Sequence, residues 1–522
     1  MRSRSIAAVF KSTACLPEVV CQEFEQDHSL MLMPAETRLP DASIWSHTSI
    51  TAALAGALAG YNLTKEDLEE RWSKNKTLSH PYLATFTFTP IQELIKASRK
   101  MRDFWAGSWI LHYLSAKVSW KLANIYGPDT LLYPSLYQQP LIDQWLLKNW
   151  SDFGNWIKPP SAQQQLTAGF PNVLVLVLPE DAVKSAMQTA NQTLKQEWRN
   201  LSRLVLQELQ TTRKWMPDLN LDSKTWKGWL DAQWQTYWTA VPIGKQAVDL
   251  KTAAIERDRT AEFQPWQDAQ NQAYNLNQDQ KLFQEQELDF LRVAHQHRFE
   301  TQGRRFSVNV GSWWGYIFDQ TRLGLTAVKN ARTWEIPTAF GPRSTISGIG
   351  PVVHPSSDWI SEKQAKQYWQ QNAGLFDGKE QLNATETVKR GLHRVLPKLL
   401  DIEQQNAISY PDLTAGVAGY LKVTSKSGLE PQQHFDKTCQ AIIDKFEWVE
   451  KAIEDMEGKW GIPLIDKANT KYHPRLLNAG WLVEDAEDTE IKQLQQALDK
   501  EQDSDIAEEL SQQIQQIKLK CC

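Results

Sequence analysis

The chain has 522 residues, of which 41% are hydrophobic, and this length and composition suffice for two or three folded domains. Its formal net charge of −5 argues against a free-standing nucleic-acid binder, which is usually basic, but leaves room for a local basic patch. The sequence shows neither the ~20 apolar residues of a membrane helix nor the ~7–15 of a signal-peptide core. The five cysteines form no CxxC pair and predict no disulfide framework, so we expect a reducing, cytoplasmic setting.

The first 75 residues have a helical pattern. A helix rich in alanine and glycine is predicted from Ile44 to Tyr61, with Asp41 or Ser43 as its cap. Its small residues would allow close packing against a neighbouring element.

Residues 76–245 predict a domain that mixes strands and helices. Apolar side chains alternate with threonines over 84–89, and a continuous apolar run covers 172–178. Two further strands are expected near 130–134 and 236–241. Helices are predicted over 98–125, with Ser98 as the cap, and over 180–209. The order is β-α-β-β-α-β with both helices on one face, so we expect an α+β fold with a ferredoxin-like sheet.

The remaining residues predict a mainly helical domain at 246–483 and a polar helical tail at 484–522. An amphipathic helix is expected from Ala384 to Leu400, and Pro397 would kink it or end it early.

Several long and specific motifs occur in a fixed order. They are residues 37–47 (TRLPDASIWSH), 103–108 (DFWAGS), 133–145 (YPSLYQQPLIDQW), 375–378 (LFDG) and 410–419 (YPDLTAGVAG). Together they resemble the Cas-ten family, the large subunits of type III-B (Cmr-type) CRISPR effector complexes. The resemblance covers about residues 34–484.

The resemblance implies a domain plan and two chemistries. Residues 1–75 would be the remnant of a permuted HD domain, and residues 76–245 a cyclase-like first palm without catalytic residues. The family has a His-Asp nuclease and an Asp-Asp cyclic-oligoadenylate synthase, yet this sequence contains neither dipeptide. We therefore expect a truncated or split large subunit that lacks most of the HD nuclease and the second, catalytic palm.

Two segments of the first palm are candidates for nucleotide binding or a domain interface. Asp103, Gly107 and Ser108 begin the long helix, where small residues permit close approach by a backbone or a ligand. Ser135 and Gln139 follow a strand end and would either reach a ligand or cap the turn. Packing of the helix on the sheet is the alternative for the first group.

Metal binding has weak support in the sequence. His47 lies in the motif that ends the family's HD domain, so it is a candidate remnant ligand or, alternatively, a structural histidine. His295 and His297 would chelate only from a strand or loop. The loop 341–355 occupies the place of the family's zinc motif but contains only His354, so no zinc is expected, and the loop is interpreted as a packing or partner-contacting element. ATP and a divalent metal would bind only in a reassembled large subunit.

Lys389, Arg390 and Arg394 form a basic helical stretch that is a candidate RNA or partner contact, with a solvated face as the alternative.

Two functional hypotheses follow. The chain is either a non-catalytic component of an antiviral type III-B complex, or half of a split synthase that a separately encoded second palm completes. A non-functional gene remnant is a third reading. The resemblance implies other Cmr-type subunits as partners, with crRNA and target RNA met through the complex, and no membrane.

Overall fold

The structure is a computed structural model that describes most of the first half of the chain and parts of the second. The described residues are 7–11, 15–24, 27–35, 42–60, 79–211, 215–243, 313–331, 341–356, 358–371, 376, 380–400, 429–445, 464–466 and 471–472, with isolated positions in 268–293 and 494–514. Within them, no helix is both long and apolar enough to cross a membrane. The fold is α+β.

The chain forms two units that are interleaved along the sequence. The first unit contains residues 1–91, 111–197 and 234–334, and the second contains 92–110, 198–233 and 335–522. The helices α6 (Met101–Tyr126) and α9 (Glu180–Thr211) each contribute residues to both units. The sequence had predicted consecutive segments with boundaries near residues 75, 245 and 483.

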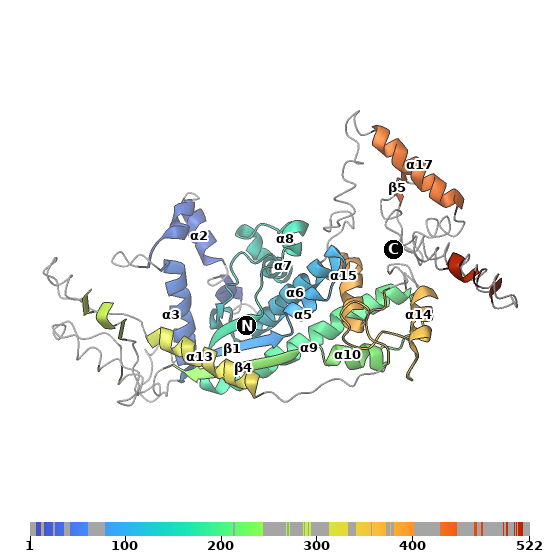
Figure 1. Ribbon diagram of the computed structural model, residues 1–522. Helices are drawn as coiled ribbons and strands as arrows, with labels where there is room; N and C mark the ends of the chain where they lie inside the picture. The colour runs from blue at the N-terminus through green and yellow to red at the C-terminus, as the bar shows by residue number, and fades with distance from the viewer. Residues whose placement is uncertain are drawn as a thin grey trace. The chain divides into compact units, whose positions relative to one another are not determined.

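A four-stranded antiparallel sheet forms the centre of the first unit (Figure 1). Its strands lie in the order β2-β3-β1-β4. Their bounds are Pro81–Thr89 for β1, Leu131–Tyr133 for β2, Val173–Pro179 for β3 and Gln235–Pro242 for β4. The central strands β1 and β3 carry β-branched and aromatic residues, which pack well on a pleated surface.

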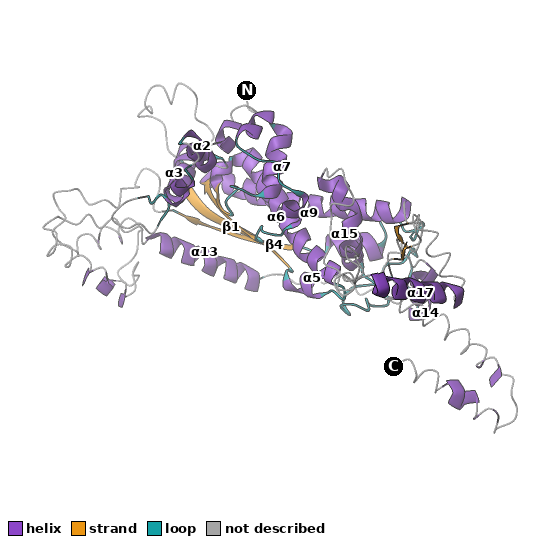
Figure 2. Ribbon diagram, turned by 90° about the horizontal axis from the view of Figure 1, so that it is seen from above, coloured by secondary structure: helices purple, strands orange, loops and turns teal. Residues whose placement is uncertain are grey.

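Helices cover both faces of this sheet. One face carries Phe86 and Leu174, which lie opposite each other and are fully buried. Thr236 of β4 donates a hydrogen bond to Asn191 of α9 at 3.2 Å, which places α9 on this side. Figure 2 shows α6 and α9 together on one side of the sheet and α13 on the other.

The second face is built on Leu83 and Val177, another directly opposed pair. They form a buried cluster with residues of α3 (Ile44–Ala59) and α13 (Trp313–Asn330). A Cβ atom at Gly324 of α13 would lie 2.8 Å from Oγ1 of Thr239, so glycine allows α13 to approach β4 closely.

Shorter helices complete the first unit. Before the sheet lie α2 (Leu16–Glu23) and the 3₁₀ turn η1 (His28–Leu32). Between β2 and β3 lie α7 (Pro140–Asn149), the 3₁₀ turn η3 (Ser151–Asn155) and α8 (Ala162–Leu166). The turn η2 (Pro128–Thr130) leads into β2.

The second unit is helical in its well-described part. It contains α5 (Gln92–Lys96), the start of α6, the end of α9, the π-helical turn η4 (Lys224–Gly228), α10 (Trp229–Asp231), α14 (Glu362–Gln371) and α15 (Ala384–Leu400). Further along are α17 (Leu429–Lys445), β5 (Leu464–Asp466) and β6 (Lys471–Tyr472). Trp215, Trp369 and Phe376 form a buried aromatic cluster with ring centroids 5.0–5.5 Å apart.

Over residues 76–245 all four strands overlap their predicted positions, and α6 and α9 overlap the two predicted helices. The further helices α5, α7, α8 and α10 lie among them and were not predicted. Ser43 is the cap of α3, since its Oγ accepts a hydrogen bond from the backbone N–H of Ser46 at 3.1 Å. The helix predicted from Ala384 to Leu400 is confirmed as α15, which continues through Pro397. The predicted cap Ser98 is wrong, since α6 begins at Met101.

Candidate functional site

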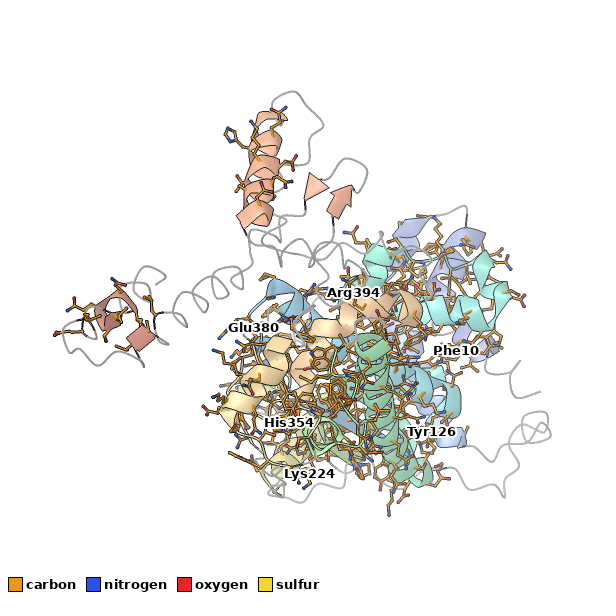
Figure 3. All side chains as sticks on the ribbon, turned by 90° about the vertical axis from the view of Figure 1, so that its right-hand side faces the viewer. Phe10, Tyr126, Lys224, His354, Glu380 and Arg394 are labelled. Atoms are coloured by element: carbon orange, nitrogen blue, oxygen red, sulfur yellow. The ribbon has the colours of Figure 1, made fainter. Side chains whose placement is uncertain are left out.

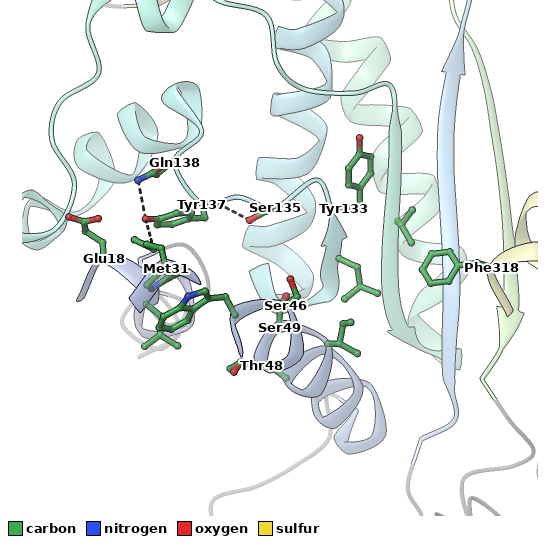
Figure 4. A pocket seen from close by; sticks show the side chains of 17 residues that line it. Glu18, Met31, Ser46, Thr48, Ser49, Tyr133, Ser135, Tyr137, Gln138 and Phe318 are labelled. Carbon is green, nitrogen blue, oxygen red and sulfur yellow. Dashed lines mark hydrogen bonds between the residues drawn. The ribbon is translucent and has the colours of Figure 1, made fainter. Parts of the chain in front are cut away.

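A pocket of about 980 Å³ opens on the second face of the sheet (Figure 4). Its floor is apolar and comes from β2, β3 and α13, through Leu132, Val175 and Phe318. Its walls come from α2, η1, α3 and the turn after β2. The residues that line these walls are Leu16, Pro17, Glu18, Met31, Trp45, Ser46, Thr48, Ser49, Ile50, Ala52, Tyr133, Ser135, Tyr137 and Gln138.

The turn after β2 is held by local hydrogen bonds. The Oγ of Ser135 accepts from the backbone N–H of Tyr137 at 3.2 Å, as in other serine turns. Gln138 has a φ of 53°, which is uncommon for a residue other than glycine. Its Nε2 donates to the Tyr137 hydroxyl at 3.0 Å. The turn therefore directs polar groups into one end of the pocket.

Tyr137 is at the centre of this polar end. Its hydroxyl donates to the sulfur of Met31 at 3.7 Å, and Glu18 lies beside it in Figure 4. Burial, together with the negative charge of Glu18, raises the pKa of Tyr137 to about 12. The phenol is therefore protonated at neutral pH and can donate or accept a hydrogen bond.

The wall from α3 adds hydroxyl groups at helical spacing. Ser46 and Ser49 are three residues apart, so they lie on one face of the helix. Trp45 is fixed by a hydrogen bond from its Nε1 to the Leu30 carbonyl at 3.2 Å. The side chain of Thr48 is turned to its own helix, because its Oγ1 donates to the Ile44 carbonyl at 2.8 Å.

The charge of the pocket restricts what it can hold. Glu18 is an acidic residue, and none of the described residues that line the pocket is a lysine, arginine or histidine. A phosphate group would find no cation there, whereas an uncharged ligand with an apolar part and hydrogen-bonding groups would find both kinds of partner.

A second arrangement, in the helical unit, is a buried network of charges. Arg390 of α15 is completely buried and forms ion pairs with Asp103 of α6 at 2.6 Å and with Glu380 at 2.8 Å. Burial favours a higher pKa for Asp103, but the Arg390 guanidinium and its hydrogen bonds outweigh burial and hold this pKa below its usual value. Glu380 also lies 3.7 Å from Arg99.

Lys389 is buried beside this network and caps α5. Its Nζ donates to the carbonyls of Leu94 and Ala97 at 2.6 Å each and to Ser98 Oγ at 2.7 Å. The last carbonyls of a helix lack partners within the helix, so Lys389 supplies them with donors.

The loop 341–355 is tied to the start of α15. Ser344 donates a hydrogen bond to the carboxylate of Glu386, and the backbone N–H of Val353 donates to the Leu382 carbonyl at 2.9 Å. These contacts agree with the reading of the loop as a packing element. His354, the candidate zinc ligand of this loop, is fully buried, and burial lowers its pKa.

The structure changes the interpretation of several predicted residues. Lys389 and Arg390 were expected on a solvated, phosphate-attracting face, but both are buried and committed to internal partners, so this prediction is wrong for them. Arg394, one turn further along α15 and labelled in Figure 3, is half-buried. Asp103 is buried in the ion-pair network.

Gly107 lies close to the backbone of a neighbouring helix. A Cβ atom there would lie 3.2 Å from the Cα of Ile95, so the neighbour is the α5 backbone. Ser108 is half-buried on α6, while Ser135 lines the pocket and Gln139 immediately precedes α7.

His47 is exposed on α3, between residues that line the pocket. Across the described part of the chain, no group of three or more His, Cys, Asp and Glu side chains is arranged to hold a metal ion. His295 and His297 lie outside the described residues.

Sequence reasoning missed most of the pocket. Tyr137 and Gln138 were within a quoted motif but were not singled out, and the spacing of Ser46 and Ser49 could have indicated a polar helix face. Glu18 and Phe318 carried no signal, because they are distant in sequence from the other lining residues.

Comparison with known proteins matches the sheet and its helices to one family. Residues 83–203, from β1 into α9, match the family model described as CRISPR-associated protein Cmr2, N-terminal. This segment resembles the Cmr2 N-terminal family. The chain is 31% identical over 130 residues to the Cmr2 subunit of the CRISPR Cmr system of Pyrococcus furiosus, and these residues are 25% of this chain and 12% of that protein.

The Cmr2 subunit of Saccharolobus solfataricus is 31% identical over 103 residues, which are 20% of this chain and 8% of that protein. A solved structure of the type III-B Cmr-beta complex in its apo state contains a chain with 14% identity and a TM-score of 0.42. That comparison covers 84% of this chain and 43% of the other. The Cmr2-like match thus spans a small part of its curated relatives and includes the turn that carries Ser135.

Proposed function

We propose that this chain is a component of a type III-B CRISPR RNA-guided effector complex, to which it contributes the non-catalytic first palm and helical domain of the large subunit. The observation that carries the proposal is the match of residues 83–203 to the Cmr2 N-terminal family. These residues include most of β1, all of α6, β2 and β3, and part of α9, so the similarity falls on three of the four strands and on the helices beside them.

The topology supports the finer assignment of a ferredoxin-like palm. The element order β-α-β-β-α-β and the antiparallel strand order β2-β3-β1-β4 are those of the split βαβ arrangement. Among the residues predicted to contact a ligand, Ser135 lines the pocket. Ser108, Gln139 and Arg394 remain predicted contacts to a nucleotide, a second palm or RNA.

The expected partners are the other Cmr-type subunits, with crRNA and target RNA held by the complex. Structures related to this chain include a type III-B Cmr-beta complex bound to cognate target RNA. A separately encoded second palm is a further candidate partner.

The test is co-expression of the tagged full chain with the other Cmr-type subunits and the guide RNA of the same host. We expect the subunits and the guide RNA to co-purify with the chain through affinity and size-exclusion steps. Leu176→Lys, which places a charge in the buried sheet, is the negative control and is expected to lose them. Elution of the wild-type chain as a monomer apart from an otherwise assembled complex would reject the proposal.

A further inference from the structure

Four tryptophans of the first unit lie together on a part of its surface that is rich in lysine. Trp120 is on α6, Trp145 is on α7, and Trp150 and Trp156 flank η3. All four are half-buried, whereas Trp109, Trp198 and Trp369 of the second unit are completely buried or nearly so. We call this group, with the lysines around it, the Trp–Lys surface.

The rings form a continuous row. The centroids of Trp145 and Trp120 are 5.7 Å apart, and those of Trp120 and Trp150 are 6.2 Å apart. Phe153 lies 5.8 Å from Trp150 and 6.3 Å from Trp156, which continues the row. Phe10 is buried and packs against Trp120 and Trp150. This packing fixes the middle of the row.

A lysine lies over the ring at each end of the row. The Nζ of Lys117 is 4.5 Å from the centroid of Trp145, and the Nζ of Lys11 is 3.8 Å from that of Trp156. These distances are those of cation–π contacts. The aromatic row therefore keeps positive charge at both ends of one surface.

The local charge is opposite to that of the whole chain. The segments that build the Trp–Lys surface, residues 7–11, 111–126 and 140–158, contain five lysines and two aspartates. Lys121, Lys148 and Lys158 are exposed, as is Lys11. Because the complete sequence has a net charge of −5, this excess of lysine is a local feature.

The acidic groups nearby do not cancel this charge. Burial raises the pKa of Asp143 to about 7, so this carboxyl is partly neutral at neutral pH. Asp152 is exposed next to the aromatic row. Glu197 accepts a hydrogen bond from Tyr113 at 3.4 Å and also attracts Lys117. The exposed lysines still outnumber these carboxylates.

We propose that the Trp–Lys surface binds single-stranded nucleic acid. Lysines neutralise backbone phosphates, and tryptophan faces stack on unpaired bases, which is the combination used by proteins that bind single strands without sequence preference. A duplex would offer phosphates but keep its bases away from the rings. The surface is separate from the pocket, and its binding by the chain alone does not depend on the function proposed above.

The experiment measures binding of the full chain to fluorescently labelled 20-mers of rU and dT by anisotropy, at several salt concentrations. We expect binding to both strands that weakens with salt. The variant Lys121→Glu/Lys148→Glu should bind at least tenfold more weakly at low salt. The slope of log Kd against log salt should fall by about 0.7 for each phosphate that the variant no longer neutralises.

The matched control is Lys363→Glu/Lys366→Glu, which makes the same charge change at two exposed positions of α14 in the other unit. It should bind like the wild-type chain. Stacking is tested with Trp145→Ala, for which we expect about tenfold weaker binding. Trp145→Phe, which keeps an aromatic face, should retain most of the affinity, and circular dichroism verifies that each variant is folded.

Three results would overturn the proposal. One is a lack of binding to either strand at low salt. Another is equal weakening by the α14 control, which would indicate non-specific attraction. The third is competition by poly-glutamate as effective as by the oligonucleotides, with Trp145→Ala unchanged, which would indicate a docking surface for an acidic protein.

Discussion

The side chain of Arg390 is a buried charge that is compensated by ion pairs. A buried guanidinium is tolerated when carboxylates pair with it and accept its hydrogen bonds. Asp103 does both, and Glu380 adds a second ion pair at 2.8 Å. Three hydrogen bonds join Arg390 to Asp103, two of them through Nε. Removal of one partner leaves a buried charge with fewer partners, which costs more than the pair itself contributes.

Asp103→Asn is therefore expected to destabilise the chain by about 3–5 kcal/mol, because it leaves Arg390 buried with incomplete compensation. Urea denaturation followed by circular dichroism measures the change. The matched control is Asp222→Asn, which breaks an exposed ion pair with Lys227 at 2.8 Å. We expect a much smaller effect for it, because solvent screens an exposed pair. Equal effects of the two substitutions would show that burial of the Arg390 pair has no energetic consequence.

The stability of the chain should also depend on Asp143. Burial raises its pKa to about 7, compared with about 4 in an unfolded chain. The folded state therefore holds a proton that the unfolded state loses between these values, and the contribution to stability is full below about pH 4 and is lost as the pH rises through 7.

Asp143→Asn cannot ionise, so it is expected to be more stable than the wild-type chain by about 1–3 kcal/mol at pH 8 and equal to it near pH 4. Urea midpoints at the two pH values give the comparison. Asp152→Asn, which removes an exposed carboxylate nearby, is the control for the loss of a negative charge at this surface. A gain in stability from Asp143→Asn that does not vary with pH would contradict the assignment.

Among the elements, those with a regular apolar pattern were predictable and those defined by remote contacts were not. The strands β1 and β3 follow from alternation and from a continuous apolar run. The helices α7 and α8 were not predicted, because the proline-containing segments between the second and third predicted strands resemble turns. The covering of the second sheet face by α13 could not be predicted, since it joins residues far apart in sequence.

The burial of side chains that depends on contacts remote in sequence could not be predicted either. Lys389 and Arg390 follow each other in an amphipathic helix, and charged residues in such a pattern are normally solvated. Their burial depends on Asp103 and on the end of α5, about 290 residues earlier. Ser135 could be singled out because it follows a strand end, where ligand-contacting residues often occur, but its pocket needed α3 and α13 to be placed.

Close packing between α15 and α9 leads to a prediction at Gly391. A Cβ atom there would lie 2.6 Å from Cγ1 of Val205, well inside van der Waals contact. Gly391→Ala is expected to destabilise the chain by about 1–2 kcal/mol, because overpacking outweighs the better helix propensity of alanine. Thermal denaturation measures the effect.

The control for this prediction is Gly228→Ala. Gly228 has helical backbone angles, and a Cβ atom there would have no neighbour within 4 Å. We expect this substitution to be neutral or to stabilise by about 0.5–1 kcal/mol. If Gly391→Ala behaves in the same way, the contact between the two helices is looser than the structure indicates.

For the whole molecule, the sequence predicts a chain without synthase activity of its own. Its 522 residues contain no Asp-Asp dipeptide, and phosphoryl transfer generally requires groups that hold divalent metals on the nucleotide phosphates. The purified chain, incubated with ATP and Mg²⁺ or Mn²⁺, should yield no cyclic oligoadenylate by chromatography. Synthesis that a single Asp→Ala change in this chain abolishes would show that an active centre was overlooked.

The interleaving of the two units along the chain has a consequence for biosynthesis. Asp103 and Arg390 are separated by 287 positions, so Asp103 leaves the ribosome long before its partner. At about 5–20 residues per second the delay is roughly 15–60 s. Throughout that time the start of α6 carries a carboxylate and apolar side chains without their final neighbours. The helical unit can therefore complete its packing only after the later segment is synthesised, in a step that closes a long loop.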